Sequence, residues 1–468
     1  MLDRFFHLSE NHSNVRTELL AGLTTFLTMA YIIVVQPMVL SGRMSGRLTG
    51  MDFDAVTTAT CIAAALASAI MGLYGRYPIA QAPGMGENFF FVALVAGAAP
   101  VMSWQTGLGV VFYSGVVFLL LSTLGVREKL MEAISPSMRN GIAVGIGLFI
   151  VVIGMRTAHL LLGNKEDGGW KLNPQFASPD LIVFFLGLLV TAALHARRVR
   201  GSIILGIAAS TAFAAALKLG LPLLGQPVAD APLVAKSMLA TQFAFAKGVV
   251  ALPPPIAPTL LKLDLVSPLS WAMAPFILIF LFMVLFDTLG TLIGVAEQAG
   301  LVRDNRLPRA RQALMSDAVG TVAGAMLGTS TVTSFIESAA GVEQGGRTGL
   351  TAIVAAALFL LALFFSPIIN MIGSYPPITA PALVVVGTMM MRNVTKIDWE
   401  NYAESLPAFL VVAGIPLCYS IADGLALGFI AYPLVKLLSG QGREVKWLMY
   451  VMAVVLVAYF VAVRVQSA

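Results

Sequence analysis

Charged side chains are scarce in this sequence. Asp, Glu, Lys and Arg together make up 11% of the 468 residues, whereas hydrophobic residues make up 58%. An average soluble domain carries about 25% charged residues. The composition therefore excludes an ordinary water-soluble domain and indicates a protein that contacts membrane lipid over much of its surface.

Cysteines and recognisable catalytic motifs are also nearly absent. The two cysteines, Cys61 and Cys418, both lie in apolar segments, which argues against a disulfide framework or a thiolate metal site. No metal-ligand spacing, nucleophile–base pair or phosphate-binding glycine loop occurs. We therefore expect no metal, no cofactor and no enzymatic activity.

Apolar runs of roughly 17 to 25 residues, long enough for a spanning helix, recur along the whole chain. The first seven are predicted near 18–40, 55–74, 84–98, 103–125, 133–157, 179–197 and 201–222. After a Pro-rich connection, seven more are predicted near 270–298, 310–328, 332–345, 347–366, 376–393, 421–439 and 445–464. The stretch 403–418 is additional and contains prolines, so it is interpreted as interfacial, re-entrant or the first half of a kinked helix. The sequence predicts an all-α polytopic membrane protein with 14 transmembrane segments.

The two halves of the chain resemble each other weakly. The tripeptide TGL at 106–108 recurs at 348–350, and VG at 144–145 recurs at 386–387 with the same offset. Seven segments per half is an odd number, so the second half would enter the membrane in the opposite orientation. This pattern is the inverted repeat of secondary transporters.

Loop charges indicate the orientation in the membrane, because Lys and Arg favour the cytoplasmic side of a membrane protein. The basic residues of this chain therefore do not indicate nucleic-acid binding. The polar N-terminus lacks the apolar core of a signal peptide, and we expect it to stay in the cytoplasm. The cluster of Lys436, Arg443 and Lys446 fits less well if 403–439 crosses only once. With the N-terminus in the cytoplasm, the basic loops that fall on the cytoplasmic side contain Arg127 and Lys129, Arg197, Arg198 and Arg200, and Arg303, Arg306, Arg309 and Arg311.

The third and tenth segments are short and follow turn-prone or β-favouring residues, RYPIAQAPGMGEN and GTSTVTSFIES. Paired, interrupted segments in corresponding positions of two halves indicate a transport site. Extended backbone at membrane depth is tolerated only where protein or a water-filled cavity covers it. We therefore expect two short helices whose N-terminal N–H groups meet near the middle of the membrane.

Two acids, Asp287 and Glu337, lie within apolar stretches, where ionisable residues usually mark a substrate or ion pathway. Asp287 also fits a structural carboxyl, and Glu337 fits an acid favoured by a helix N-terminus. Glu87 and Asn88 occupy the first turn of the third segment, where Asn88 also fits a helix cap. Asp317 is interpreted as an ion-pair partner of a nearby arginine, Arg309 or Arg311.

These side chains suggest a ligand with both hydrogen-bond donors and acceptors. Carboxylates accept hydrogen bonds from ligand N–H groups, whereas Asn88 and backbone N–H groups donate to ligand N and O atoms. A flat heteroaromatic base fits this pattern, and a simple anion does not. A buried carboxyl at Asp287 or Glu337 could also carry a proton and couple transport to the proton gradient.

Several motifs resemble the AzgA-like purine permeases of the nucleobase-ascorbate transporter group. They run along nearly the whole chain: RTELLAGLTTFLTMAYIIVVQP at 16–37, APGMGENFFF at 82–91, FDTLGTLIG at 286–294, SFIESAAGVEQGGRTGLTA at 334–352, IDWENYAESLPAFL at 397–410 and YSIADGLALGFI at 419–430.

The resemblance implies a core domain (1–125 and 270–366) and a gate domain (126–225 and 367–468), joined by an extracytoplasmic connection at 226–269. It implies purine contacts from Asn88, Asp287 and Glu337, with Gly86, Glu87 and Phe335 in the same site motifs. It also implies proton-coupled import, an elevator-like movement of the core domain, and a homodimer formed through the gate domain.

Three positions depart from the family pattern. Glu87 replaces the small or apolar residue that is usual before Asn88, Gln36 stands where Asn is usual before Pro37, and Asp423 stands where Asn is common. Glu87 could favour a base rich in N–H groups such as guanine, alter proton coupling, or point away from the site.

The sequence thus favours a proton-coupled importer of guanine, hypoxanthine or adenine in the bacterial inner membrane, with both termini in the cytoplasm. A transporter of xanthine or uracil, or an anion transporter of the same fold, is the alternative. A channel or membrane receptor would also fit the apolar composition.

Overall fold

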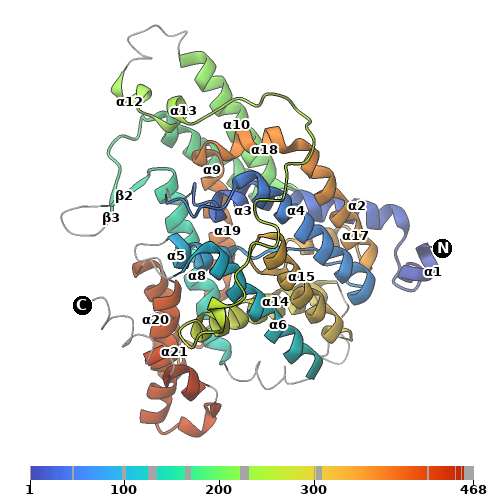
Figure 1. Ribbon diagram of the computed structural model, residues 1–468, viewed down its shortest axis with the longest axis vertical. Helices are drawn as coiled ribbons and strands as arrows, with labels where there is room; N and C mark the ends of the chain where they lie inside the picture. Colours follow the sequence, from blue (N-terminus) through green and yellow to red (C-terminus); the bar gives the residue numbers. More distant parts are fainter. Residues whose placement is uncertain are drawn as a thin grey trace.

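The computed structural model describes residues 2–44, 47–96, 102–124, 134–163, 170–221, 231–299, 301, 308–418, 421–447, 449–454 and 456–457. Within these ranges the chain is almost entirely helical, which confirms the predicted all-α class (Figure 1). Arg127, Lys129, Arg303 and Arg306, and most of the predicted segment 445–464, lie outside the described residues or at their edge.

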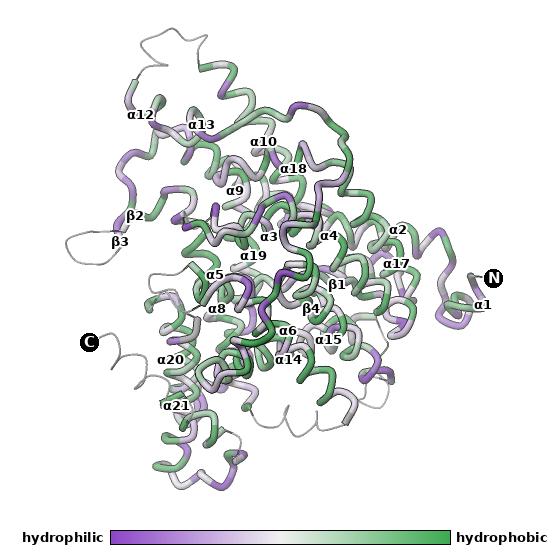
Figure 2. Tube along the Cα trace, in the orientation of Figure 1, coloured by the Kyte–Doolittle hydropathy of each residue, from purple (hydrophilic) through white to green (hydrophobic). Residues whose placement is uncertain are grey.

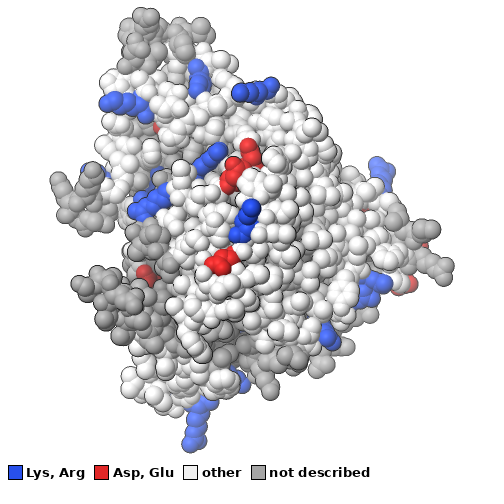
Figure 3. All heavy atoms as spheres, viewed as in Figure 1, with Lys and Arg blue, Asp and Glu red and all other residues white. Residues whose placement is uncertain are grey.

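Many of the helices are apolar on all sides, as expected for segments that face both protein and lipid. Seven of them within the described ranges are long and apolar enough to cross a membrane. Shorter apolar helices in the same ranges include Met85–Ala96 and Tyr402–Leu417. Hydrophobic residues cover the helices in Figure 2, and charged residues are sparse on the face shown in Figure 3.

Local sequence signals set several helix starts in the first half. Asn14, Asp52, Ser135 and Ser178 each accept a hydrogen bond from the backbone N–H three residues later, which caps the helix that follows. The elements are α1 (Leu2–Phe6), α2 (Val15–Met29), α3 (Ile32–Leu40), α4 (Phe53–Ile70), the π-helical turn η1 (Met71–Gly75), β1 (Gln81–Pro83), α5 (Met85–Ala96), α6 (Trp104–Leu124), α8 (Pro136–Thr157), β2 (Leu161–Gly163), β3 (Trp170–Leu172), α9 (Pro179–Ala196) and α10 (Ser202–Gly220).

The second half follows a long connection that contains only short helices in its described part. Its elements are α12 (Pro232–Ala235), α13 (Met238–Thr241), η3 (Ser267–Leu269), α14 (Ala274–Gln298), α15 (Ala310–Leu327), β4 (Val332–Ser334), α16 (Ser338–Glu343), α17 (Gly349–Ala362), η4 (Leu363–Phe365), α18 (Ser366–Gly373), η5 (Pro376–Ile378), α19 (Ala380–Met390), η6 (Met391–Lys396), α20 (Tyr402–Leu417), α21 (Ile421–Leu438) and η7 (Gly442–Glu444).

The helices pack in two groups, each with members from both halves of the chain. Helices α2 to α6 and α14 to α17 pack mainly on one another, and we call them the first bundle. Helices α8 to α10 and α19 to α21 also pack mainly on one another, and we call them the second bundle. The two halves of the sequence are therefore interleaved rather than folded as separate domains.

Helix α20 corrects the interpretation of 403–418. It lies beside α21 and α8, and the two helices form a hairpin at the lower left of Figure 1. A Cβ at Gly414 would lie 3.1 Å from Gly424 Cα, and one at Gly428 would lie 3.0 Å from the Pro407 carbonyl oxygen. These small residues let the two backbones approach closely. The segment is a separate packed helix, not the first half of a kinked helix.

The described part of the connection between the halves is fixed to both bundles. Near the second bundle, Asp180 of α9 accepts hydrogen bonds from the backbone N–H groups of Met238 (2.9 Å) and Leu239 (3.0 Å) and from the Tyr375 hydroxyl (2.7 Å). Asp180 is only 4% exposed. This carboxylate therefore holds α13 against the start of α9.

The other end of the connection is fixed to the first bundle. The Thr58 hydroxyl donates to the Pro254 carbonyl oxygen at 2.9 Å, and the Leu261 N–H donates to the Met326 carbonyl oxygen at 2.7 Å. The Thr106 hydroxyl donates to Asp264 Oδ2 at 3.2 Å. The connection is thus a strap that joins the two bundles on one side of the protein.

We predict that Asp180→Ala releases α13 from α9. The change removes the carboxylate that accepts hydrogen bonds from three donors. Each lost hydrogen bond to a charged group costs about 1.5–3 kcal/mol. Hydrogen–deuterium exchange should become faster at 237–243. Tyr375→Phe removes a single donor and should have a smaller effect, and Asp398→Ala, on an exposed loop, should have none. Unchanged exchange in Asp180→Ala would contradict this role.

Candidate functional site

Strands β1 and β4 place the two interrupted segments side by side inside the protein. They pair antiparallel, with Gln81 opposite Ser334 and Pro83 opposite Val332, and all six strand residues are buried. Additional backbone bonds at both ends, such as Gly84 N–H to the Thr331 carbonyl oxygen at 3.0 Å, extend the pairing. The predicted extended entry to each short helix is therefore confirmed, because the strands satisfy each other's backbone groups away from water.

Asn88 lies in the first turn of α5 and is fully buried. Its side-chain oxygen accepts a hydrogen bond from Gln36 Nε2 at 3.0 Å and another from the Ser330 hydroxyl, and its Nδ2 donates to Gln36 Oε1. The side chain does not cap α5, so the capping alternative is wrong. Asn88 joins α3, α5 and the entry to β4, and its contact with a ligand stays a prediction.

Gln36 is the partner that the sequence reasoning did not assign to the site. It is fully buried in α3, and its Nε2 atom also lies 2.9 Å from Thr329 Oγ1 and 3.3 Å from Ser330 Oγ. A polar residue before Pro37 in an otherwise apolar helix was the available signal, because buried amides need partners.

Glu337 precedes α16, and its carboxylate accepts a hydrogen bond from the Tyr31 hydroxyl at 2.8 Å. The side chain forms no capping hydrogen bond to α16. Tyr31, which the sequence reasoning missed, lies only 1% exposed at the start of α3. The contact therefore joins the two halves of the chain at the site, and the side chain of Glu337 remains partly accessible.

Asp317 is a further buried acid whose interpretation from sequence was wrong. It is fully buried, and both carboxylate oxygens accept a hydrogen bond from the Ser334 hydroxyl, at 3.0 and 3.3 Å. Its partner is thus strand β4, not Arg309 or Arg311. Together with Glu87, Asp287 and Glu337, it makes four carboxyl groups around the strand pair, and none of the four forms a salt bridge within the described part of the chain.

Asp287 is central to this group of acids. It lies close enough to Glu87, Asp317 and Glu337 to interact electrostatically with each of them. Its side chain is nevertheless exposed, although it lies in the middle of α14. Asp287 therefore faces an open space inside the protein, and the predicted intramembrane acid has access to a ligand or to water.

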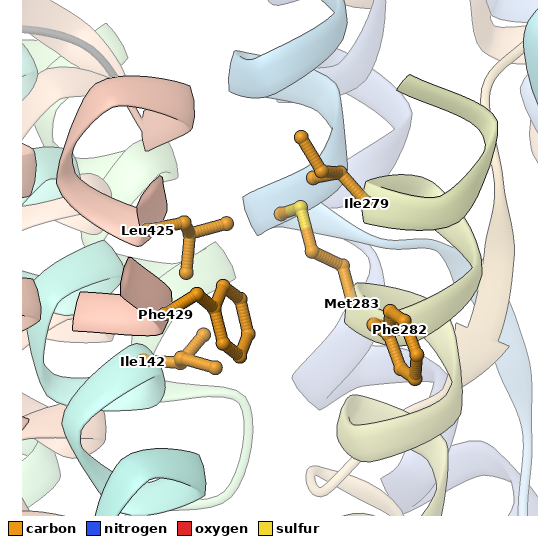
Figure 4. A pocket seen from close by; sticks show the side chains of 6 residues that line it. All are labelled: Ile142, Ile279, Phe282, Met283, Leu425 and Phe429. Carbon is orange, nitrogen blue, oxygen red and sulfur yellow. The ribbon is translucent and has the colours of Figure 1, made fainter. Parts of the chain in front are cut away.

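A small apolar cleft lies between the two bundles beside α14 (Figure 4). Its lining residues come from three helices: Ile142 of α8, Ile279, Phe282 and Met283 of α14, and Leu425 and Phe429 of α21. Asp287 follows Met283 by one helical turn and lies on the same side of the helix. The apolar cleft and the acids are therefore neighbouring parts of one site.

Gly86 places the first turn of α5 at the same cleft. A Cβ at Gly86 would lie 3.1 Å from Ile146 Cγ2 of α8 and 3.9 Å from Met283 Cε. Phe335 follows β4, is 6% exposed, and donates its N–H to the Ala80 carbonyl oxygen at 3.1 Å. Its ring belongs to the hydrophobic core, and its contact with a ligand stays a prediction.

Buried polar atoms without a hydrogen-bond partner also surround the strand pair. Among the described residues these include Gln81 Oε1 and the hydroxyls of Thr331, Thr333 and Thr288. The Thr333 hydroxyl is directed toward Asp287 and the Thr288 hydroxyl toward Asp317, although neither reaches hydrogen-bond geometry. Unpaired buried polar atoms are costly and indicate a place for a ligand or water.

A protein-family model described as the permease family (Xan_ur_permease) matches residues 16–427. The chain belongs to this family. The match confirms the family resemblance seen in the sequence motifs and makes the protein a membrane transporter.

Three curated relatives cover almost the whole permease. A putative permease of Methanocaldococcus jannaschii is 44% identical and covers 98% of each chain. The guanine/hypoxanthine permease PbuO of Bacillus subtilis is 39% identical, over 96% of this chain and 98% of that one. The adenine permease AdeQ of Escherichia coli is 36% identical, over 99% and 96%.

A solved structure supports the fold of the permease. The transmembrane domain of a cyanobacterium bicarbonate transporter, BicA, superposes with a TM-score of 0.58 at 14% identity, covering 90% of this chain and 97% of that one. At this identity the similarity concerns the fold alone.

We predict that Gln36→Leu destabilises the permease. The substitution nearly preserves the side-chain volume but leaves Asn88 Nδ2 without its acceptor and Thr329 Oγ1 without its donor. Each buried unsatisfied group costs about 1–3 kcal/mol. The thermal unfolding midpoint of the purified protein should fall. Gln242→Leu, on the exposed connection, is the matched control and should leave it unchanged. Equal midpoints for the two variants would show that the network does not stabilise the site.

Proposed function

We propose that this permease imports purine nucleobases together with protons. The observation that supports this most directly is an exposed carboxyl group, Asp287, one helical turn beyond Met283, which lines the apolar cleft. Small-molecule sites combine apolar walls with a few placed polar groups. A purine has two flat apolar faces and an edge of N–H groups, so it suits a site of this composition.

The walls and the polar end of the site would contact different parts of the base. Phe282, Phe429 and Met283 offer aromatic and thioether surface for the flat faces. The Asp287 carboxylate would accept hydrogen bonds from ring or exocyclic N–H groups. Purine permeases among the relatives support the same substrate class.

We assign the proton to the acids of the site, with Glu337 and Asp287 as the groups implied by the family resemblance. Glu337 stands at the start of the second short helix, and Asp287 is exposed in the middle of α14. Protonation of a carboxyl at this depth removes a charge that the apolar surroundings disfavour. Loading and release of a proton would therefore change how the site holds a base.

The two bundles provide the parts that alternating access requires. We assign the first bundle to the core domain and the second to the gate domain, with boundaries at 1–125, 126–225, 270–366 and 367–468, and the strap within 226–269. The acids and both short helices belong to the first bundle, and the cleft separates it from α8 and α21 of the second. An elevator-like shift of the first bundle would carry the base across.

The hairpin of α20 and α21 also supports the proposed orientation in the bacterial inner membrane. A hairpin that crosses twice returns Lys436 and Arg443 to the side on which α20 begins. With the N-terminus inside, that side is the cytoplasm, in agreement with the rule for basic residues. A homodimer through the second bundle stays a prediction from the family resemblance.

We predict that cells lacking their own purine transporters accumulate labelled guanine, hypoxanthine or adenine when they express this permease, and that a protonophore abolishes accumulation. Xanthine, uracil and bicarbonate in the same assay test a different nucleobase and an anion. Accumulation of bicarbonate alone would support the anion alternative, and accumulation of no purine would refute the proposed substrate class.

We predict that Glu337→Gln abolishes accumulation while leaving the protein in the membrane. The amide keeps the size of the side chain and can still contact Tyr31, but it cannot exchange a proton. Tyr31→Phe removes only the hydrogen bond and should reduce the rate less. Wild-type accumulation by Glu337→Gln at equal expression would exclude Glu337 from the proton pathway.

A further inference from the structure

We propose that Glu87 and Asp287 form a carboxyl pair that shares one proton, in which Asp287 contacts the substrate and Glu87 holds the proton while the substrate is bound. The proposal rests on the proposed function, because it assigns the proton that accompanies the base. Glu87 is the acid that departs from the family pattern.

The position of Glu87 brings its carboxyl group back to the start of its own helix. Glu87 is 2% exposed and lies in the first turn of α5. A Cβ at Gly84 would overlap Glu87 Oε2 and would lie 3.2 Å from Thr333 Oγ1. The absence of a side chain at Gly84 therefore makes room for this carboxyl beside strand β4.

Thr333 connects the surroundings of the two acids. Its hydroxyl is buried without a hydrogen-bond partner in the described part of the chain, and it is directed toward Asp287. The carboxyl of Glu87 approaches it from α5, and Asp287 approaches it from α14. The two carboxyl groups thus approach strand β4 from different helices and interact electrostatically with each other.

The other ionisable groups around the pair increase the cost of a second negative charge. Asp317 of α15, Glu337 before α16 and Tyr31 of α3 all interact electrostatically with Asp287. Each of them is neutral or negative, and the salt bridges in the described residues lie elsewhere. Two neighbouring carboxylates without a cation repel each other strongly in an apolar interior, so a pair that has released its proton readily takes up another.

The unequal accessibility of the two acids assigns their roles. Asp287 is exposed one helical turn beyond Met283 of the cleft, whereas Glu87 is almost completely covered. A base whose N–H groups bind Asp287 favours its ionised form, which leaves the shared proton on Glu87. When the base leaves, the proton passes from Glu87 to Asp287 and from there to water in the cleft.

The test uses purified protein in liposomes that contain a pH-sensitive dye, with the purine that the wild-type protein accumulates. Inward transport by the wild type should acidify the lumen. Glu87→Gln and Glu87→Leu should still equilibrate the purine along its concentration gradient, but the acidification should be lost. Glu400→Gln, an equivalent change on an exposed loop, should retain both signals.

A variant that binds the purine without transporting it is tested by calorimetry. Purine binding is measured in two buffers of different protonation enthalpy, which gives the number of protons exchanged on binding. The number of protons exchanged on binding should differ between the wild type and Glu87→Gln. Wild-type acidification per purine, an unchanged proton number, or loss of purine binding in both folded Glu87 variants would each overturn the proposal. A wild-type protein that carries no purine, or carries it without protons, would instead overturn the proposed function.

Discussion

The structure depends on how backbone groups are satisfied where two helices are interrupted inside the protein. An interrupted helix exposes N–H and C=O groups that no water can reach at membrane depth, and each unsatisfied group costs several kcal/mol, roughly 2–7 by transfer estimates. Strands β1 and β4 satisfy each other's backbone N–H and C=O groups by pairing along three residues. The same pairing brings together Thr333, Asn88 and the acids, so the site exists because the two interruptions meet.

Electrostatics then gives the site its selectivity. Four carboxyl groups surround the strand pair, and Asp287 interacts with the other three without a described cation between them. An anion would meet the same repulsion that the acids impose on one another, whereas a neutral base with N–H groups would relieve it. The similarity to a bicarbonate transporter at 14% identity concerns the fold alone, because a ligand is recognised by the side chains of a site and not by the arrangement of the helices.

Packing within the bundles differs from packing between them. Inside the second bundle, glycines allow direct backbone contact, as at Gly147, where a Cβ would lie 3.0 Å from the Gly387 carbonyl oxygen. Between the bundles lies the apolar cleft, lined by side chains such as Ile142 and Phe429. Closely packed interiors behave as rigid units, and an interface of apolar side chains can slide more easily. The strap, fixed at Asp180 on one side and at Thr58 on the other, limits how far the two units can separate.

The sequence by itself determined the features that depend on neighbouring residues. Continuous apolar runs predicted the membrane helices, turn-prone residues before 85 and 338 predicted the two interruptions, and the motifs predicted the family. Only the tertiary structure decided which polar groups meet. Asn88 and Ser330 are 242 residues apart in sequence, Asp317 bonds to Ser334 rather than to a nearby arginine, and α20 packs against α21. Hydropathy reports the surroundings of a segment, whereas the partner of a buried amide or acid depends on the positions of distant helices. For the same reason the sequence could name Asp287 and Glu87 but could not show that one is exposed and the other is buried.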